Sequence, residues 1–384
     1  MNELFVEVAN GSLTKFGEEL CGDKVEVVRG KDTVTIVLAD GLGSGVKANI
    51  LATLTAKIAA TMRSKGASID EVVTTIIQTL PTCKVRQLAY STLSLLEIDR
   101  FGQAYLVEFD NPPVILLHQE QHQVQSQSRE VAGRLVRESR FQLAEGDFLA
   151  LISDGVVHAG VGAVLNLGWQ WQNVADYLER MVKAERRSVG RVVRDLLDVC
   201  ENLYQFRPGD DATVVGVSVR RPVKVCLFTG PPMDPKDDEV ICRRLAEFDG
   251  IKVVCGGTAA NILARCWGKE ARMEEYIDED IPPTAVIEGI DLVTEGILTL
   301  NRAVEMIHRT DSDGRIPNGR DGASRLARLL LEDCTELTVL LGQRINPAHL
   351  NPQLPVRLGP KVQVIGELVE LLQKRGKQVR VEYF

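Results

Sequence analysis

The sequence predicts two domains of different class, an α+β domain over residues 1–221 and a smaller α/β domain over residues 222–384. In the first part, short apolar runs bounded by Gly and Asp surround two helical regions, which is typical of mostly antiparallel strands. In the second part, apolar runs alternate with helical segments, which favours a mostly parallel sheet. Arg220-Arg221-Pro222 lies between the two patterns and predicts the joint. The length of 384 residues suits two domains of ~100–200 residues each.

The elements of the first domain are predicted from apolar patterning and from residues that start or stop helices. The predicted strands are 5–8, 24–28, 33–39, 91–98, 103–109, 114–117, 147–152 and 213–219. The predicted helices are 44–65, 69–80, 171–184 and 189–203. Gly66 stops the first helix, and the second begins after the N-cap residue Ser68 and ends at Pro81. The polar stretch 119–129 predicts an exposed hairpin or loop.

The second domain alternates between the two kinds of element. Its predicted strands are 223–228, 251–254, 337–341 and 379–382, and its predicted helices are 235–248, 258–267, 295–308, 320–332 and 364–374. Two glycine-containing loops, Thr229–Pro232 and Cys255–Thr258, follow the first two strands. Open α/β sheets bind ligands at such strand ends, so these loops are candidates for a small ligand, with a tight turn as the alternative reading. We expect a sensor or docking domain that regulates the first domain.

Composition and charge exclude several classes of protein. Charged residues make up 26% of the chain and no apolar run reaches the ~20 residues of a membrane span. The net charge is −8, from 45 Lys and Arg against 53 Asp and Glu, and the absence of a basic block argues against a nucleic-acid partner. The start, MNELFVEVANG, lacks the basic and apolar parts of a secretion signal. Eight scattered cysteines without zinc spacing predict reduced thiols, so we expect a cytoplasmic protein.

Four aspartates of the first domain share one context, at the tip of an apolar strand. They are Asp23 in Cys21-Gly22-Asp23, Asp40 before Gly41-Leu42-Gly43-Ser44-Gly45, Asp154 before Gly155, and Asp210 after Pro208-Gly209. Strand tips can converge at one edge, where carboxylates ~4 Å apart would repel by about 4 kcal/mol at an effective dielectric of ~20. Protonation or divalent cations would relieve this repulsion. Oxygen ligands favour Mg²⁺ or Mn²⁺, and two such ions sharing a carboxylate can hold a bridging hydroxide and clamp a phosphoryl group.

Each of these motifs has a plainer reading when it is taken alone. An Asp-Gly pair is usually a turn. The run Gly41–Gly45 is similar to a phosphate loop but lacks the Gly-Lys-Ser/Thr ending and the dinucleotide spacing, which argues against nucleotide binding. Ser44 and Ser153 have no His beside them in the sequence, so a serine nucleophile is not favoured. The functional prediction therefore rests on the joint pattern and order of the acidic motifs.

That order resembles the metal-dependent protein phosphatases of type 2C, and most of all their bacterial branch, the stage II sporulation protein E-like serine phosphatases. The matching motifs are Gly22-Asp23, Asp40–Gly45, Ser153-Asp154-Gly155, Gly209–Val214, Asn111-Pro112-Pro113 and Glu145-Gly146-Asp147. The resemblance covers residues 1–220 and does not extend to the second domain. It implies an αββα sandwich with two Mn²⁺ or Mg²⁺ ions at one edge.

The resemblance also implies a role for each acidic residue. Asp40 resembles the carboxylate that bridges both metals, and the carbonyl of Gly41 resembles a ligand of one of them. Asp154 and Asp210 resemble ligands of the other metal, so Asp40, Asp154 and Asp210 are the implied catalytic residues. Asp23 resembles the acidic residue near the first metal, which often acts through water.

The sequence departs from the family at two positions. Many eukaryotic members have a His after Asp-Gly as a candidate general acid, whereas this chain has Leu42, so a metal-bound water is the expected proton source. Cys21 stands where Ser is common, and its plainer reading is a small packed thiol. Asp211, where members have Asn or Asp, is a candidate neighbour of the ligands. His158 could reach the same edge from its place four residues after Asp154, but we leave it outside the predicted site.

The resemblance implies a phosphatase that hydrolyses phosphoserine and phosphothreonine through a metal-bridging hydroxide in bacterial regulatory signalling. Its implied substrate is a phosphorylated anti-sigma-factor antagonist or a similar small regulator. Helices 44–65 and 69–80 match a regulatory switch of the sporulation branch, with a plain packed layer as the alternative. Two other functions stay open, a catalytically weak scaffold that binds phosphoproteins and a small-molecule phosphatase.

Overall fold

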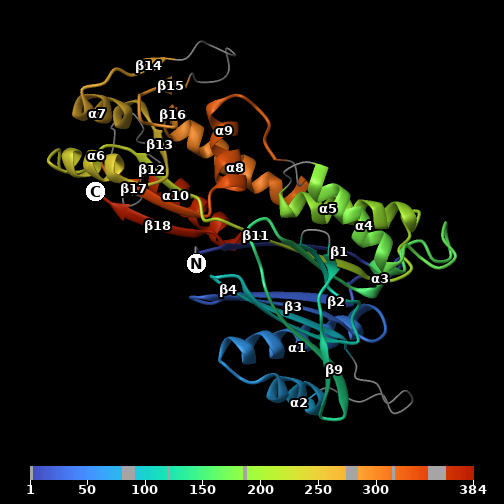
Figure 1. Cartoon of the computed structure of the whole chain (residues 1–384). Coiled ribbons are helices and arrows are strands. Elements are labelled where there is room, and N and C mark those ends of the chain that lie inside the picture. The colour runs from blue at the N-terminus through green and yellow to red at the C-terminus, as the bar shows by residue number, and fades with distance from the viewer. Residues whose placement is uncertain are drawn as a thin grey trace. The chain divides into compact units, whose positions relative to one another are not determined.

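The chain forms two compact units, Met1–Arg221 and Pro222–Phe384, in a computed structural model (Figure 1). The structure describes residues 3–79, 91–118, 121–184, 188–273, 284–313, 316–344 and 360–384. The predicted helix stop at Pro81 lies outside these ranges.

Two antiparallel sheets form the N-terminal unit. The first has the order β1-β11-β10-β6-β7 and the second the order β2-β3-β4-β5-β9-β8. Strands of the first sheet are β1 (Phe5–Leu13), β6 (Ile115–His118), β7 (Gln121–Gln123), β10 (Phe148–Ile152) and β11 (Ala212–Arg220). Strands of the second are β2 (Asp23–Arg29), β3 (Thr33–Asp40), β4 (Leu93–Asp99), β5 (Gln103–Phe109), β8 (Gln127–Val131) and β9 (Arg134–Gln142). The helices are α1 (Gly45–Ser64), α2 (Ile69–Thr79), α3 (Asp154–Val157), α4 (Trp171–Ala184) and α5 (Val189–Leu203).

Three apolar clusters hold these elements in four layers. Between the sheets, side chains of β3 and β4 such as Ile36 and Leu96 pack against Leu149 of β10 and Val215 of β11. A second cluster joins α1 and α2 to the outer face of the second sheet. A third joins α4 and α5 to the outer face of the first sheet. The αββα sandwich implied by the resemblance is therefore confirmed.

Strand β9 was not predicted from the sequence. Its segment RLVRESRFQ carries charges at four of nine positions, which obscures the apolar alternation of a strand. In the fold, Glu138 accepts a hydrogen bond from the Tyr105 hydroxyl, and Arg137 lies 3.5 Å from the buried Glu108 carboxylate of β5. Arg129 of β8 also pairs with Glu138, but Tyr105 and Glu108 belong to a strand about thirty residues earlier, which the local sequence does not reveal.

The C-terminal unit is built on a mostly parallel sheet, as predicted. Its order is β14-β15-β16-β13-β12-β17-β18, and β16, β13, β12, β17 and β18 are parallel neighbours. The strands are β12 (Lys224–Thr229), β13 (Ile251–Cys255), β14 (Arg272–Met273), β15 (Ala285–Val286), β16 (Leu292–Thr294), β17 (Glu336–Leu341) and β18 (Gln378–Tyr383). The helices are α6 (Asp237–Glu247), α7 (Gly257–Trp267), α8 (Ile297–Asp313), α9 (Gly322–Arg328), the π-helix η1 (Leu329–Asp333) and α10 (Pro360–Lys374). Apolar clusters cover both faces of this sheet.

The two glycine-containing loops of this unit lie at the carboxyl ends of adjacent parallel strands. Gly230 follows β12 with φ +75°, and Gly256 follows β13 with φ +118°. The Thr229 hydroxyl donates to the Cys255 carbonyl at 3.0 Å and joins the two strand ends.

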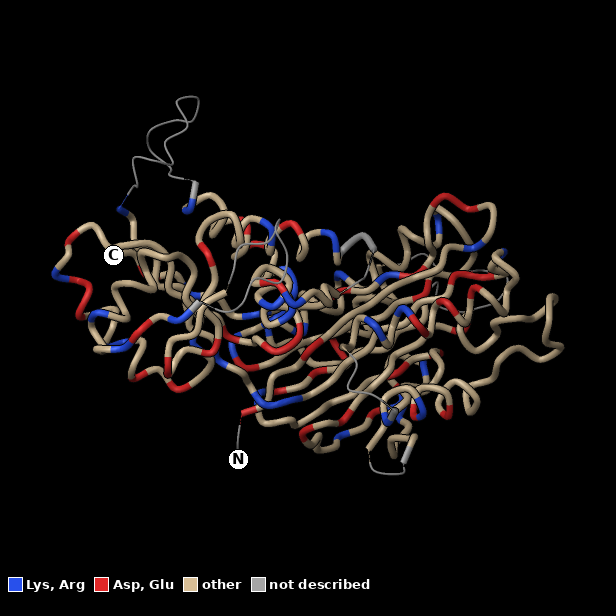
Figure 2. The backbone as a smooth tube through the Cα atoms, turned by 90° about the horizontal axis from the view of Figure 1, so that it is seen from above, with Lys and Arg blue, Asp and Glu red and all other residues tan. Residues whose placement is uncertain are grey.

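Figure 2 shows acidic and basic residues interspersed along the described backbone of both units. Among the described residues, every helix is too short or too polar to span a bilayer.

Candidate metal centre

Asp23 and Asp40 are brought together by the pairing of two neighbouring strands. In the antiparallel ladder of β2 and β3, Asp23 lies directly opposite Asp40. Directly paired residues have side chains on the same face of the sheet, so the two carboxylates lie close together at one end of it. The next residues are held in place as well, because the Gly41 N–H donates to the Gly22 carbonyl at 3.1 Å.

Asp154 and Asp210 are placed at one edge of the other sheet. Strands β10 and β11 are antiparallel, with Ile152 opposite Val214, so the end of β10 lies beside the start of β11. Asp154 begins α3 just after β10, and Asp210 lies just before β11. The Ser153 N–H donates to the Thr213 carbonyl at 3.0 Å and fixes the two segments side by side.

The two sheet edges meet, so all the predicted carboxylates share one electrostatic environment. Asp40 is repelled by Asp23, Asp154, Asp210 and Asp211. A Cβ at Gly22 would lie 2.8 Å from Oδ2 of Asp211, which places that carboxylate against the segment before Asp23. The structure therefore brings together acidic side chains that lie up to 188 residues apart in the sequence, between Asp23 and Asp211.

The crowding of these carboxylates raises their pKa values. Burial, and to a smaller extent the neighbouring carboxylates, raise the pKa of Asp40 to about 9. Burial also raises the pKa of Asp23 to about 7; the Thr213 and Ser153 side chains act to lower it, and repulsion from Asp211 and Asp154 adds to the rise. The pKa of Asp154 is raised by burial and by Asp210, while His158 and Lys15 act in the opposite direction. The folded chain thus disfavours the negative charges that it gathers at this edge.

Asp23 is the group whose surroundings fit a cation best. Its side chain is 5% exposed, and the Thr213 and Ser153 hydroxyls lie near enough to lower the pKa of Asp23. Within the described part of the chain, however, neither carboxylate oxygen has a hydrogen bond of regular geometry. Buried polar atoms without a partner are rare and destabilising unless a ligand or ion satisfies them. Hard carboxylate oxygens are the donors that Mg²⁺ and Mn²⁺ prefer. Chemistry, charge and unsatisfied oxygens therefore fit divalent cations, although no three His, Cys, Asp or Glu side chains of the described ranges form a ready-made ligand group.

Two glycines at this edge are required by close backbone packing. A Cβ at Gly41 would fall 2.0 Å from the carbonyl oxygen of Ala48 in α1. A Cβ at Gly155 would fall 2.1 Å from the carbonyl oxygen of Asp211. These contacts bring α1 against the loop after β3, and α3 against the segment before β11. The predicted role of the Gly41 carbonyl as a metal ligand stays a prediction.

Lys15 is a member of this centre that the sequence did not reveal. Its backbone N–H donates to Oδ1 of Asp211 at 3.0 Å, and its Nζ lies 3.6 Å from Oδ1 of Asp210. The loop after β1 reaches this edge because β1 pairs with β11, with Leu13 opposite Ala212. In the sequence, a single lysine two residues after a strand does not indicate that it lies beside Asp210 and Asp211. Lys15 therefore supplies the positive charge that partly balances the acidic edge.

The remaining predicted residues have identifiable surroundings. The Cys21 carbonyl accepts a hydrogen bond from the Asn49 side chain of α1 at 2.7 Å. Burial and the Asp23 charge raise the pKa of the Cys21 thiol to about 12, which supports its reading as a packed, protonated thiol. The Ser44 hydroxyl donates a hydrogen bond to the Glu18 carboxylate at 2.7 Å, so its proton is bound to Glu18 and not to one of the four predicted aspartates. His158 caps α3, and its N–H donates to the Asp154 carbonyl at 2.9 Å.

Residues 30–220 match the family model for stage II sporulation protein E (SpoIIE). The N-terminal unit belongs to the SpoIIE family. This match covers all of the sandwich except the start of the chain, which includes β1, β2 and Asp23. Among curated proteins, none matches the chain significantly.

Several solved structures resemble the SpoIIE-family unit in fold. The phosphatase domain of SpoIIE from Bacillus subtilis is 20% identical, with 58% of this chain and 95% of that chain covered and a TM-score of 0.43. The RsbU and RsbW domains of a Mycobacterium tuberculosis protein are 17% identical, with 63% and 69% covered and a TM-score of 0.48. RsbX in complex with magnesium is 18% identical, with 57% and 97% covered and a TM-score of 0.42. The family assignment rests on the family model.

Proposed function

We propose that the SpoIIE-family unit is a divalent-cation-dependent phosphatase that hydrolyses phosphoserine and phosphothreonine in proteins. The observation that supports this most strongly is Asp23, a buried carboxylate whose oxygens have no hydrogen bond of regular geometry, paired in register with Asp40 where two sheet edges meet. A fold that gathers carboxylates against their own repulsion needs compensating positive charge. The family to which the unit belongs is named for a protein whose phosphatase domain has the same fold.

The residues that would hold two Mn²⁺ or Mg²⁺ ions are the ones implied by the resemblance. Asp40 would bridge them, with the Gly41 carbonyl on one ion, Asp154 and Asp210 on the other, and Asp23 beside the first. When bound, such ions activate water and neutralise charge on a phosphoryl group. The chain's own part is to fix the carboxylates by strand pairing, to exclude solvent around Asp23, and to balance charge through Lys15.

Leu42 stands at the position where many eukaryotic members have a His, and its apolar side chain cannot protonate a leaving serine oxygen. His158 and Lys15 both lie close enough to Asp154 to lower the pKa of that carboxyl, so they are candidate ionisable alternatives in the described part of the unit. We propose that the substrate is a phosphorylated regulatory protein, such as an anti-sigma-factor antagonist, in a bacterial cytoplasm. We further propose that the C-terminal unit regulates this activity.

The test compares two kinds of substrate with and without metal. The full chain is freed of metal with a chelator and then titrated with Mn²⁺ in the presence of a phosphothreonine peptide or of a sugar phosphate. We expect hydrolysis of the peptide to begin only when Mn²⁺ is in excess of the chelator. Full activity in excess chelator contradicts cation dependence. Faster turnover of the sugar phosphate favours a small-molecule phosphatase, and phosphopeptide binding without turnover favours a scaffold.

A further inference from the structure

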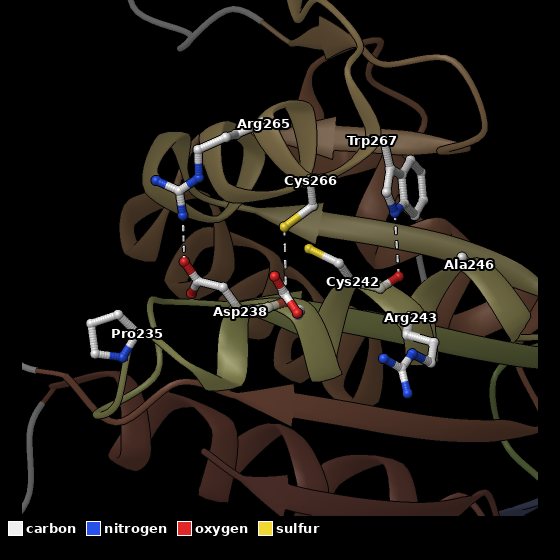
Figure 3. Close-up of a pocket in the computed structure, with 9 residues that line it drawn as sticks. Pro235, Asp238, Cys242, Arg243, Ala246, Arg265, Cys266 and Trp267 are labelled. Carbon is white, nitrogen blue, oxygen red and sulfur yellow. Dashed lines mark hydrogen bonds and ion pairs between the residues drawn. The ribbon is translucent and has the colours of Figure 1, made fainter.

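A cavity of about 610 Å³ in the C-terminal unit is lined by residues of α6 and α7. Two cysteines lie in its wall, Cys242 from α6 and Cys266 from α7. Figure 3 shows their side chains pointing toward one another across the gap between the helices. Each sulfur also approaches the other helix, because the Cys242 Sγ lies 4.0 Å from the Ile262 carbonyl of α7, and Cys266 contributes to raising the pKa of the Cys242 thiol.

The two helices are already joined on both sides of this thiol pair. On one side, the Arg265 guanidinium forms an ion pair with the Asp238 carboxylate. On the other, the Trp267 indole N–H donates to the Cys242 carbonyl at 3.3 Å. The Cys266 thiol also lies 4.0 Å from the carbonyl of Asp238, one helical turn before Cys242. These contacts hold the segments of α6 and α7 that carry the two cysteines against each other.

The two thiols differ in their access to solvent. Cys266 is exposed, whereas Cys242 is 3% exposed and belongs to an apolar cluster. Burial, with the neighbouring Cys266, raises the pKa of the Cys242 thiol, so Cys242 is poorly suited to react first with a dissolved oxidant. Among the described cysteines, Cys266 alone is exposed, and Cys21 is half-buried. An exposed thiol beside a buried one is the arrangement in which the first is oxidised and the second resolves it.

We propose that Cys242 and Cys266 are a redox-active dithiol that peroxides convert reversibly into a disulfide linking α6 to α7. In the first step, the Cys266 sulfur attacks hydrogen peroxide, the O–O bond breaks, and Cys266 sulfenic acid and one water form. In the second, the Cys242 sulfur attacks the Cys266 sulfur, an S–S bond forms and the S–O bond breaks. The departing hydroxide takes the Cys242 proton and leaves as a second water. Two thiols are oxidised, one peroxide is reduced, and a dithiol reductant reverses the change.

The experiment uses the full chain treated with one equivalent of hydrogen peroxide. Remaining thiols are blocked with N-ethylmaleimide, and the chain is digested with trypsin, which releases Cys242 in peptide 237–243 and Cys266 in peptide 266–269. We expect the two free peptides to be lost together and to reappear as one linked species, which dithiothreitol converts back. Loss of the Cys266 peptide alone, a link from Cys266 to another cysteine or another copy, or no oxidation would each overturn the proposal.

Three single variants make the result specific. In Cys242→Ser, Cys266 should stop at the sulfenic acid, which dimedone traps. In Cys266→Ser, the Cys242 peptide should stay unmodified, because its thiol is buried. Cys21→Ser, which removes a half-buried thiol of the other unit, should still form the link. Because Cys266 is exposed, its replacement leaves the core intact, so Cys266→Ser remains informative even if Cys242→Ser unfolds. Oxidation of Cys242 in Cys266→Ser would overturn the proposed order of reaction.

Discussion

The acidic edge of the N-terminal unit and the carboxyl edge of the parallel sheet in the C-terminal unit both collect glycine-containing loops at strand ends. They differ in whether their polar groups are satisfied. At the acidic edge, both carboxylate oxygens of Asp23 are buried without a hydrogen bond of regular geometry. At the other edge, the hydroxyl of Thr229 bonds the Cys255 carbonyl, and the hydroxyl of Thr294 bonds the Glu295 carbonyl. Glycines at strand ends therefore do not distinguish a site from a turn, whereas unsatisfied buried charge does.

Removing Asp40, the carboxylate proposed to bridge the two cations, should have the largest effect. We expect Asp40→Asn to lower phosphopeptide hydrolysis in saturating Mn²⁺ by roughly 10²–10³-fold, the range for loss of a single electrostatic contributor to catalysis. Asp32→Asn is the matched control, because Asp32 lies in the turn between the same two strands at their other end and pairs with Arg100. Steady-state rates of the two variants measure the effect. Equal rates would show that the acidic edge does not take part in the reaction.

The glycines of the two edges should respond differently to a methyl group. Gly41→Ala places a Cβ 2.0 Å from the Ala48 carbonyl and should destabilise the protein by about 1–3 kcal/mol. Gly257→Ala, at the first turn of α7, meets nothing within 4 Å and should be neutral or stabilise by up to about 1 kcal/mol. Urea unfolding followed by circular dichroism compares them. A neutral Gly41→Ala would mean that α1 does not pack tightly against this loop.

Neutralising Asp23 should stabilise the metal-free protein. The pKa of Asp23 is raised from 3.8 to about 7 in the folded state. Between pH 3.8 and about pH 7, the folded chain therefore binds more protons than the unfolded chain. Stability contributed by this group is therefore lost as pH rises through 7. We expect Asp23→Asn in chelator at pH 8 to be more stable than the unmodified protein by on the order of 1–2 kcal/mol.

The same variant should gain less stability from Mn²⁺ than the unmodified protein, because it has lost a candidate ligand. Thermal unfolding in chelator and in excess Mn²⁺ gives both comparisons. An Asp23→Asn protein that is less stable than the original in chelator would show that the charged carboxylate is satisfied in the folded state.

The smallest effect is expected from Lys15. Its Nζ is 3.6 Å from the Asp210 carboxylate and both side chains are partly exposed, so Lys15→Met should reduce stability in chelator by at most about 1 kcal/mol. Lys57→Met, which removes the ion pair of Lys57 with Glu26 outside the acidic edge, is the control. The loss should be larger for Lys15→Met in thermal unfolding at low salt. Equal losses of stability in the two variants would show that Lys15 does not balance the charge of the acidic edge.

The acidic centre could be predicted because each of its aspartates follows or precedes a short apolar strand, a pattern visible within a few residues. Strand pairing then brings these tips together, as the register of Asp23 with Asp40 shows. The features that escaped prediction depend on partners distant in the sequence. Lys15 reaches the centre only because β1 pairs with β11, and two charged residues of β9 contact side chains of the distant strand β5.

The thiol pair of the C-terminal unit escaped prediction for the same reason. Cys242 and Cys266 lie on different helices, and each reads as an ordinary helix residue in its own segment. Only the packing of α6 beside α7 shows that they share a cavity wall. Patterns within one element are thus readable from the sequence, while contacts between elements require the fold.

The measurement that tests the central claim most directly is calorimetric titration of the metal-free full chain with Mn²⁺. The acidic edge gathers buried carboxylates that repel one another, so we predict saturable binding that is lost in Asp40→Asn and retained in Asp32→Asn. Binding that is the same in all three proteins, or no binding at all, would contradict the claim that cations hold these carboxylates together.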